Sequence, residues 1–342
     1  MRVRLTQYAL LAASAVGSGC ASWATRNEVE WTSRASATVE RMVVSMATNL
    51  HLQVTAPSRA EAMQASESGL QAIEAVNARL STWRPDSELS QLNSLRVGSY
   101  MNLSGALLED LRKARWWQRA TGGAFDPAVG ALVDLYQLRD GGHWPTDQEV
   151  WACLPHCGLD QLQVVHGNTG RRSAKLRLEE GGFGKGAGLD AAARAMLEAG
   201  ATAVVMDFGG QVLRAGQHDT PADYDIAAPD DRLRGVVRVS VDSGSLATTA
   251  NSERRFQVGD RSLGHILDPR TGRPAADFGS VTVWATDAFT ADCLSTGLFV
   301  MGPDVALAWA EQHEGVEVLV LVASGDAAKP QLIVSSVKAE GD

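Results

Sequence analysis

Strand-like and helix-like segments are mixed along this chain of 342 residues, and they do not follow a strict βαβ order. Parallel strands need a long crossover, usually a helix, between each pair. The mixed order therefore favours an α+β fold with a mixed, largely antiparallel sheet and flanking helices. No obvious linker and no repeat of fixed period interrupts residues 41–342, so we expect a single domain there.

Local signals predict where the elements lie. Ser58 with Glu61, and Thr146 with Glu149, are typical of capping boxes at helix starts. Helices are expected over 59–80, 104–121, within 123–138, and over 146–158, 189–199, 287–301 and 303–313. Strands are expected over 42–56, 175–180, 201–210, 212–216, 236–244, 245–249, 280–286, 316–323 and 331–337, with a hairpin at 254–269 that turns at Gly259-Asp260 and a loop at 81–93.

The chain is acidic, with a formal net charge of −9 and an isoelectric point of about 5.3. Nucleic-acid-binding proteins present a basic face, so no nucleic-acid partner is expected. A small anionic ligand is compatible with this charge, because a local pocket can be positive on an acidic protein.

The N-terminus is typical of a secretory signal. Two arginines precede an apolar stretch, Tyr8 to Val16, that is too short to span a bilayer. Small residues ending at Cys20 indicate a bacterial lipoprotein in which this cysteine is acylated after cleavage. We expect residues 1–20 to be the signal peptide and 21–40 a tether; the alternative is a secreted protein cut a few residues later.

Three further cysteines do not make a disulfide framework or a zinc site. Cys293 is expected to be a small buried hydrophobic residue. Cys153 and Cys157 lie four residues apart, and a local bridge between them is compatible with an oxidising compartment. Their redox state stays open at the sequence level.

The stretch GGFGKGAGLD at 181–190 joins a strand-like run to a helix-like run. It is not a P-loop, because Lys185 is followed by glycine rather than by serine or threonine. It matches a dinucleotide fingerprint only loosely, with Asp207 about twenty residues on. A lysine where backbone N–H groups converge at a helix start favours an anion site. The alternative is a flexible turn.

A second constellation lies in DAFTADCLSTGLFVMG at 287–302. Asp292 and Thr296 are four residues apart on one helical face, with Ser295 beside them. A carboxylate and a hydroxyl suit Mg²⁺, which takes few protein ligands and leaves room for phosphate oxygens. The alternative is a carboxylate near a helix N-terminus and a threonine bonded to its own helix.

A third constellation is GHILDPRTGRP at 264–274, where two turns follow the end of a hairpin strand. His265 stands at that end. A single histidine is more often structural than catalytic. Beside a diphosphate, a neutral histidine would serve as a base near pH 7.

Together these pieces resemble the ApbE family, the FAD:protein FMN transferases. The resemblance covers about residues 40–337, in matching order and spacing. It is carried by HILDPRTGRP, by GGFGKGAGLDAAA followed by MDFGGQVLRAG, by TADCLSTGLFVMG, by STWRPDSELSQLN, by GAFDPAVGALVDLY and by an N-terminal SMAT.

The resemblance implies an ApbE-like, T-fold-related domain over 41–342 that binds FAD and Mg²⁺ in the periplasm. Such enzymes cleave the diphosphate, release AMP and attach FMN through a phosphoester to a threonine or serine of an acceptor flavoprotein. The acceptor would carry a Ser/Thr-Gly-Ala-Thr-like site. The family's lipoprotein location agrees with an inner-membrane anchor at Cys20.

The resemblance also assigns roles to residues. His265 would be the candidate base for the acceptor hydroxyl. The metal would be held by Asp292 and Thr296, with Ser295 nearby and a backbone carbonyl around Gly182. The FAD would contact Met46, Trp83, Ala124, Phe125, Asp126, Glu179, Lys185 and Ile266.

The chain departs from the family pattern at several positions. Residues 247–252 read ATTANS where the family has Ala-Thr-Ser-Gly-x-Tyr. Ala128 replaces a threonine, Glu179 stands where Asp is usual, and Trp83 replaces a tyrosine and would still stack on a flavin or adenine ring. The departures at 247–252 and 128 bear on acceptor choice and on activity.

Three other functions compete with flavin transfer. In an FAD diphosphatase, water replaces the acceptor hydroxyl and the products are FMN and AMP. A non-catalytic periplasmic FAD-binding protein is favoured by the altered block at 247–252. A nicotinamide oxidoreductase would rest on the loose fingerprint and requires a parallel sheet.

Overall fold

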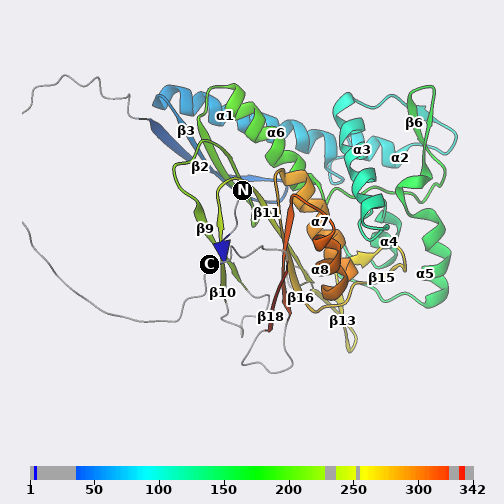
Figure 1. The fold of residues 1–342 in the computed structure, drawn as a ribbon. Coiled ribbons are helices and arrows are strands. Elements are labelled where there is room, and N and C mark those ends of the chain that lie inside the picture. Colours follow the sequence, from blue (N-terminus) through cyan, green and yellow to red (C-terminus); the bar gives the residue numbers. More distant parts are fainter. Residues whose placement is uncertain (1–3, 6–35, 228–235, 252–254, 323–330, 336–342) are drawn as a thin grey trace, which may run out of the picture.

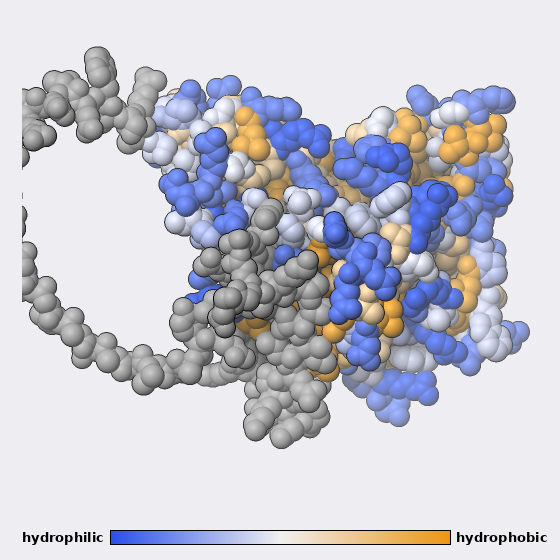
Figure 2. Space-filling model, in the orientation of Figure 1, coloured by the Kyte–Doolittle hydropathy of each residue, from blue (hydrophilic) through white to orange (hydrophobic). Residues whose placement is uncertain are grey.

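The fold is described from a computed structural model, which describes residues 4–5, 36–227, 236–251, 255–322 and 331–335 (Figure 1). Apart from Arg4 and Leu5, the predicted signal peptide lies outside these residues, and so does most of the tether. Within them, no helix combines the length and the apolar character that a membrane crossing requires. On the face seen in Figure 2, hydrophilic residues cover most of the described surface, and the hydrophobic areas are separate from one another.

An eight-stranded sheet forms the centre of the molecule, in the order β18-β17-β16-β11-β8-β7-β3-β2. Every neighbouring pair is antiparallel. The α+β prediction is confirmed, and the nicotinamide oxidoreductase alternative is wrong because it requires a parallel sheet. The strands are β2 (Ala37–Ser45), β3 (Thr48–Ala56), β7 (Ala203–Phe208), β8 (Gln211–Gly216), β11 (Gly244–Ala250), β16 (Gly279–Ala285), β17 (Val316–Val322) and β18 (Gln331–Ser335).

Four helices supply the apolar side chains that cover one face of this sheet (Figure 1). They are α1 (Arg59–Leu80), α6 (Gly184–Glu198), α7 (Ala288–Met301) and α8 (Pro303–Glu311). The first two pack on β3 and β7, and the last two pack on β16 and β17. The alternation of β16 sends Trp284 to the other face, where β9 (Ala222–Ala227) and β10 (Val236–Val241) cover it. A two-residue strand, β1 (Arg4–Leu5), pairs with β10.

A second group of elements packs beside the sheet (Figure 1). It contains α2 (Glu88–Ser94), α3 (Gly105–Ala120), α4 (Gly130–Leu135), α5 (Asp147–Cys153), 3₁₀ turns at Leu154–His156 and Leu159–Gln161, and a small sheet of β4 (Tyr100–Met101), β6 (Asn168–Arg171) and β5 (Leu162–Val165). Two hairpins follow, β12 (Arg255–Val258) with β13 (Arg261–Gly264) and β14 (Leu267–Asp268) with β15 (Arg273–Pro274).

Most elements that local sequence signals predict are present in the structure. The Ser58 and Ser104 hydroxyls accept from backbone N–H groups in the first turns of α1 and α3. Thr146 makes a complete capping box with Glu149 at the start of α5. The Asp287 carboxylate accepts from Thr290 N–H and begins α7. Local hydrogen bonds decide these boundaries, so a short stretch of sequence suffices to predict them.

Two strand predictions are wrong. Residues 42–56 form a hairpin rather than one strand, because Met46 and Ala47 turn with φ of 46° and 59°. The chain has no Gly or Asn there to signal a left-handed turn. Residues 175–180 join no sheet, because the Asn93 side chain takes the place of a neighbouring strand. It donates to Leu178 C=O and accepts from Leu178 N–H.

Three boundaries also differ from the prediction. Strand β2 begins at Ala37, inside the expected tether. The expected loop at 81–93 contains most of α2, which Ser87 caps by accepting from Ser90 N–H. Helix α6 begins at Gly184, five residues earlier than expected, so the glycine stretch forms its first turn. Glycine weakens an isolated helix, and packing compensates for this here.

Candidate functional site

Helices α6 and α7 approach closely because Gly186 has no side chain. A Cβ at this position would lie 2.3 Å from the carbonyl oxygen of Ala288. The Asp190 carboxylate accepts hydrogen bonds from Ala288 N–H and Phe289 N–H at the start of α7. Burial raises its pKa to about 6, against the effect of these two donors. The glycine stretch therefore sets the contact between two helices.

The Asp292 side chain, on α7, is held by two residues of α6. It is buried, and Gly186 N–H donates to Oδ2 at 2.9 Å. The Nζ atom of Lys185 lies 3.6 Å from Oδ1. The lysine therefore stands beside the carboxylate at the first turn of α6, where Gly184 N–H donates to Glu180 C=O and Gly186 N–H donates to Asp292.

Gly182 and Thr296 lie against each other on the same side of the site. A Cβ at Gly182 would lie 3.4 Å from the Thr296 hydroxyl oxygen and 3.2 Å from the Phe125 ring. A Cβ at Gly297 would lie 2.9 Å from the Phe125 Cβ. Two glycines thus let the Phe125 segment approach α7.

Asp292 and Thr296 open into a small pocket of about 60 Å³, enough for a metal ion or a few waters and too small for a flavin. The pocket brings together α6, α7, β11 and the segment after β13. Its lining is Gly181, Lys185, Gly209, Gln211, Ala247, Thr248, Thr249, Ala250, His265, Ile266, Asp292 and Thr296. Five predicted site residues meet there: Lys185, Asp292, Thr296, His265 and Ile266.

His265 and Ile266 reach the pocket from the segment between two hairpins. Strand β13 ends at Gly264 and β14 begins at Leu267. The buried Asn251 packs on Gly264, and its Oδ1 accepts from Ile266 N–H at 3.4 Å. Asn251 directly follows β11, so this hydrogen bond holds the histidine segment beside the central sheet.

The pocket suits Mg²⁺ better than zinc. Among the described residues, no three His, Cys, Asp or Glu side chains form a metal cluster. One carboxylate and one hydroxyl are enough for Mg²⁺, which keeps several waters and shares ligation with substrate phosphates. The Oε1 atom of Gln211, a buried residue of the pocket lining, has no hydrogen-bond partner. A metal-bound water would satisfy it.

Ser295 lies behind the pocket wall rather than in its lining. Its hydroxyl donates to Asp292 C=O and is hydrogen bonded to the Thr249 hydroxyl at 2.9 Å. These bonds fix α7 against β11. Its assignment to the metal shell stays a prediction.

Trp83, Arg139 and Glu179 form a connected cluster. The Arg139 guanidinium stands 4.7 Å from the Trp83 ring centroid and donates to the Glu179 carboxylate at 2.6 Å. Trp83 is 66% exposed, so one ring face is available to a planar ligand. Burial raises the pKa of Glu179 to about 7, partly offset by Arg139 and reinforced by Glu180.

Met46 and Asp126 flank this cluster in different ways. The Met46 methyl group lies against the first residue of α6, 3.3 Å from a Cβ placed on Gly184. The buried Asp126 carboxylate accepts from Ala128 N–H and Leu159 N–H. The Asp126 side chain therefore fixes a loop. The flavin contact assigned to residues 124–126 stays a prediction. Ala124 is buried as well.

Some pocket residues escape prediction from sequence. Gln211 lines the pocket, and Arg139 binds Glu179. Each lies outside the three constellations, although Gln211 follows a Gly-Gly turn whose first glycine also lines the pocket. A left-handed glycine pair at the end of a strand was the signal that could have found it.

The three later cysteines carry free thiols. Cys293 is buried in α7, as predicted. The Cys157 thiol lies 3.8 Å from the Cys153 carbonyl oxygen. This pair is remote in sequence from the pocket lining and contributes no group to it.

Comparison with known proteins agrees with this geometry. A sequence model of the ApbE family matches residues 46–320. A relative from Vibrio cholerae named FAD:protein FMN transferase is 30% identical over 265 residues, which are 75% of this chain and 79% of the relative. A relative of the same name from Escherichia coli K12 is 27% identical, covering 75% and 76%.

Solved structures show the same fold. The flavin transferase ApbE from Vibrio cholerae superimposes with a TM-score of 0.75 at 27% identity, covering 88% of this chain and 98% of that structure. The ApbE protein from Thermotoga maritima gives a TM-score of 0.76 at 25% identity, covering 86% and 97%. With the matched region spanning most of the sheet and every element of the pocket, the chain belongs to the ApbE family.

Proposed function

We propose that this protein transfers FMN from FAD to a serine or threonine hydroxyl of an acceptor flavoprotein and releases AMP. One observation carries the proposal: Lys185, Asp292, Thr296 and His265 line one pocket. Relatives named FAD:protein FMN transferase support the same reaction. The acceptor hydroxyl oxygen forms a bond to the FMN phosphorus, and the bond from that phosphorus to the AMP oxygen breaks.

The residues of the pocket divide this work between charge and proton transfer. Lys185, which lines the pocket from the first turn of α6, offsets the negative charge of the diphosphate. His265 takes the proton of the acceptor hydroxyl as its oxygen attacks. Thr248 and Thr249 also line the pocket, and their hydroxyls are hydrogen bonded to Thr282 and Ser295.

Asp292 and Thr296 would hold Mg²⁺, with a backbone carbonyl near Gly182. A metal held by these residues would supply charge neutralisation at the diphosphate. Gly186 N–H and Lys185 already orient the Asp292 carboxylate. Ordering one carboxylate in advance reduces the entropy that metal binding must overcome.

The flavin would lie on the side of Trp83, Arg139 and Glu179, because Glu179 lies two residues before Gly181 of the pocket lining. A planar ring stacks on an exposed indole, and the cation beside it adds polarity at the ring edge. The glutamate in place of the family's aspartate retains a carboxylate at this position.

We also propose a cellular location, which the signal-like N-terminal sequence supports. We place the enzyme in the periplasm, anchored to the inner membrane by a lipid on Cys20. Fractionation of cells that produce the chain and its Cys20→Ser variant tests this, because loss of acylation should move the protein from the membrane to the soluble periplasmic fraction. A soluble unaltered chain would contradict the anchor.

The reaction itself is tested by intact mass spectrometry. The full chain is mixed with FAD, Mg²⁺ and a small acceptor domain carrying a Ser/Thr-Gly-Ala-Thr site. Addition of one FMN to the acceptor, and its loss with EDTA, is the expected result. An unmodified acceptor with FMN and AMP in solution would identify a diphosphatase. Bound but intact FAD would identify a binding protein and implicate Thr249 and Ala250, the altered residues in the pocket wall.

A further inference from the structure

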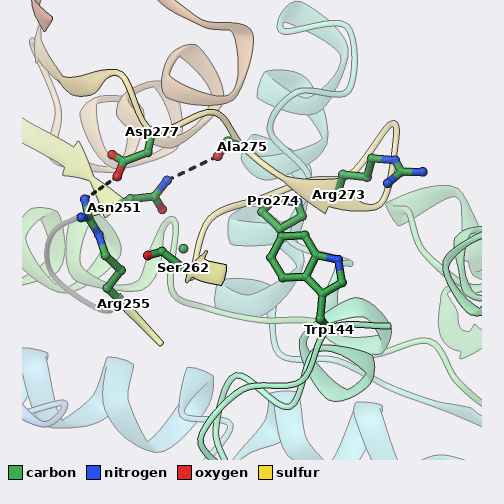
Figure 3. Close-up of a pocket in the computed structure, with 9 residues that line it drawn as sticks. Trp144, Asn251, Arg255, Ser262, Arg273, Pro274, Ala275 and Asp277 are labelled. Atoms are coloured by element: carbon green, nitrogen blue, oxygen red, sulfur yellow. Dashed lines mark hydrogen bonds and ion pairs between the residues drawn. The ribbon is translucent and has the colours of Figure 1, made fainter. Parts of the chain in front are cut away.

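A second cavity lies beside the proposed transfer pocket (Figure 3). Its volume of about 380 Å³ falls within the range of about 300–1,000 Å³ that is usual for ligand sites. The two cavities meet along two segments of the chain. Ala250 and His265 line the transfer pocket, while their neighbours Asn251 and Gly264 line the second cavity.

Asn251 separates the two cavities and fixes both of their walls. It is 1% exposed, and its side chain packs on Gly264. Its Oδ1 accepts from Ile266 N–H, and its Nδ2 donates to Ala275 C=O at 3.5 Å. The second cavity therefore ends one residue from His265, the group that would take a proton from a hydroxyl.

The cavity has one apolar and one charged wall. Figure 3 shows the Trp144 indole against Pro274 on one side. An Arg255–Asp277 ion pair stands on the other side, and Ser262 lies between the two walls. Such alternation suits an extended peptide, whose successive side chains point in opposite directions.

Backbone is also available at this cavity. Strand β13 pairs only with β12 among the described strands, so its other edge has no strand partner there. Ser262 and Gly264 of β13 line the cavity. An edge strand binds extended peptides by strand addition, which supplies affinity, while side-chain pockets supply selectivity.

We propose that this cavity binds the acceptor polypeptide next to its modified serine or threonine, with an apolar side chain against Trp144. The inference rests on the proposed transfer function. A segment lying along β13 towards Gly264 brings its next residue to His265. Small residues beside the hydroxyl suit this passage, because Asn251 fills the space next to Gly264.

The flavin reaches the transfer pocket from a different direction. Glu179 of the Trp83 cluster lies two residues before Gly181 of the pocket lining, whereas the second cavity meets the pocket at Asn251. FAD and the acceptor would therefore bind to separate surfaces. A change in the second cavity should affect the acceptor and leave FAD binding intact.

The test fills the cavity by Ser262→Tyr. Ser262 is exposed, so the added ring leaves the core undisturbed. Asp260→Tyr is the matched control, because it adds the same ring to the exposed turn of the same hairpin, outside the cavity. The full chain is titrated without Mg²⁺ into a fluorescein-labelled acceptor domain with a Ser/Thr-Gly-Ala-Thr site, and anisotropy gives Kd. Flavin fluorescence gives Kd for FAD.

We expect Ser262→Tyr to weaken acceptor binding at least about tenfold, which corresponds to about 1.4 kcal/mol. FAD binding should be the same in all three chains, and Asp260→Tyr should bind the acceptor normally. Equal acceptor binding by both variants would overturn the proposal. So would a parallel loss of FAD binding, which would assign the cavity to FAD, or a failure of the unaltered chain to bind the acceptor.

Different measurements test the proposed docking site and the proposed transfer reaction. If Ser262→Tyr blocks acceptor binding but mass spectrometry with Mg²⁺ finds no FMN on the acceptor of the unaltered chain, the docking site stands and the transfer reaction is wrong. If FMN is transferred at equal rates by all three chains, the transfer reaction stands and the docking site is wrong.

Discussion

At the scale of single residues, the site depends on side chains that are oriented before any ligand binds. Asp292 has a partner on each carboxylate oxygen, a backbone N–H on one and a lysine on the other. His265 and Ile266 are placed by the buried amide of Asn251. Groups fixed in this way act on a substrate without further rearrangement, which is the physical basis of preorganised catalysis.

His265→Ala should slow FMN transfer by about 10²- to 10⁴-fold, the usual contribution of a general base. Its effect on FAD affinity should be small, because a general base acts on the acceptor hydroxyl and is not assigned to hold FAD. Single-turnover transfer rates and the Kd for FAD are measured on the same preparation. Equal losses in both quantities would show that His265 serves binding or folding instead.

Glu179 should make stability depend on pH. Burial raises its pKa in the folded state to about 7, above its ordinary value of 4.5. The folded state therefore holds this proton more tightly than the unfolded state, and the resulting stability is present below about pH 4.5 and is lost as pH rises to about 7. Glu179→Gln should flatten this part of the profile.

Urea midpoints at pH 5 and pH 8 measure the effect. The unaltered chain should lose more stability between these values than Glu179→Gln does. Asp190 and Glu317, with pKa values raised by burial to about 6 and about 7, act in the same direction and remain in both proteins. An identical pH dependence of the two chains would show that Arg139 compensates the buried glutamate fully.

At the scale of elements, the contact between α6 and α7 decides whether the site forms. Gly186 allows the contact, Asp190 of α6 accepts from the first N–H groups of α7, and Asp292 of α7 accepts from Gly186 N–H of α6. The glycines that open α6 therefore serve helix packing as well as ligand approach. This explains why the helix begins inside a segment whose composition disfavours helix.

Gly186→Ala should separate these helices, because the new methyl group would meet the Ala288 carbonyl at 2.3 Å. Overpacking of this kind costs about 1–3 kcal/mol in unfolding free energy. Transfer should fall as Asp292 loses its position beside Lys185. Denaturant unfolding and the transfer assay measure the two effects.

Gly188→Ala is the control on the same helix. Its Cβ would lie 3.3 Å from the Ile73 Cδ1 atom, which ends a side chain that is able to shift. Alanine also favours helix over glycine. This variant should fold with nearly unchanged stability and retain activity. If both variants behave alike, the close approach at Gly186 is not what positions α7.

At the scale of the whole molecule, local sequence signals predicted the elements better than they predicted contacts. The caps at Ser58, Thr146 and Asp287 and the hairpin turn at 259–260 depend on neighbours within four residues, and the structure confirms them. The antiparallel sheet also followed from element order. The segment at 175–180 was mistaken for a strand because its pairing partner is the side chain of a distant residue, Asn93.

The residues of the candidate site also include some that the sequence predicted and some that it did not. The family resemblance predicted that Lys185, His265, Asp292 and Thr296 act together, and the fold brings them into one pocket. Arg139 was missed because it lies in a loop without a motif, 40 residues from its partner Glu179. Gln211 was missed because its importance arises from an unsatisfied buried oxygen, which only the packed structure reveals.

Because α6, α7, β11 and the segment after β13 all contribute to the pocket, ligand binding should stabilise the molecule as a unit. A ligand that binds only the folded state adds about 2.7 kcal/mol at 100 times its Kd. Thermal unfolding should therefore shift upward with FAD, and further when Mg²⁺ is added. Asp292→Asn keeps an acceptor for Gly186 N–H, so it should fold and retain much of the FAD shift. It should lose the increment from Mg²⁺. An unchanged Mg²⁺ increment in this variant would place the metal elsewhere in the fold and remove Asp292 from its shell.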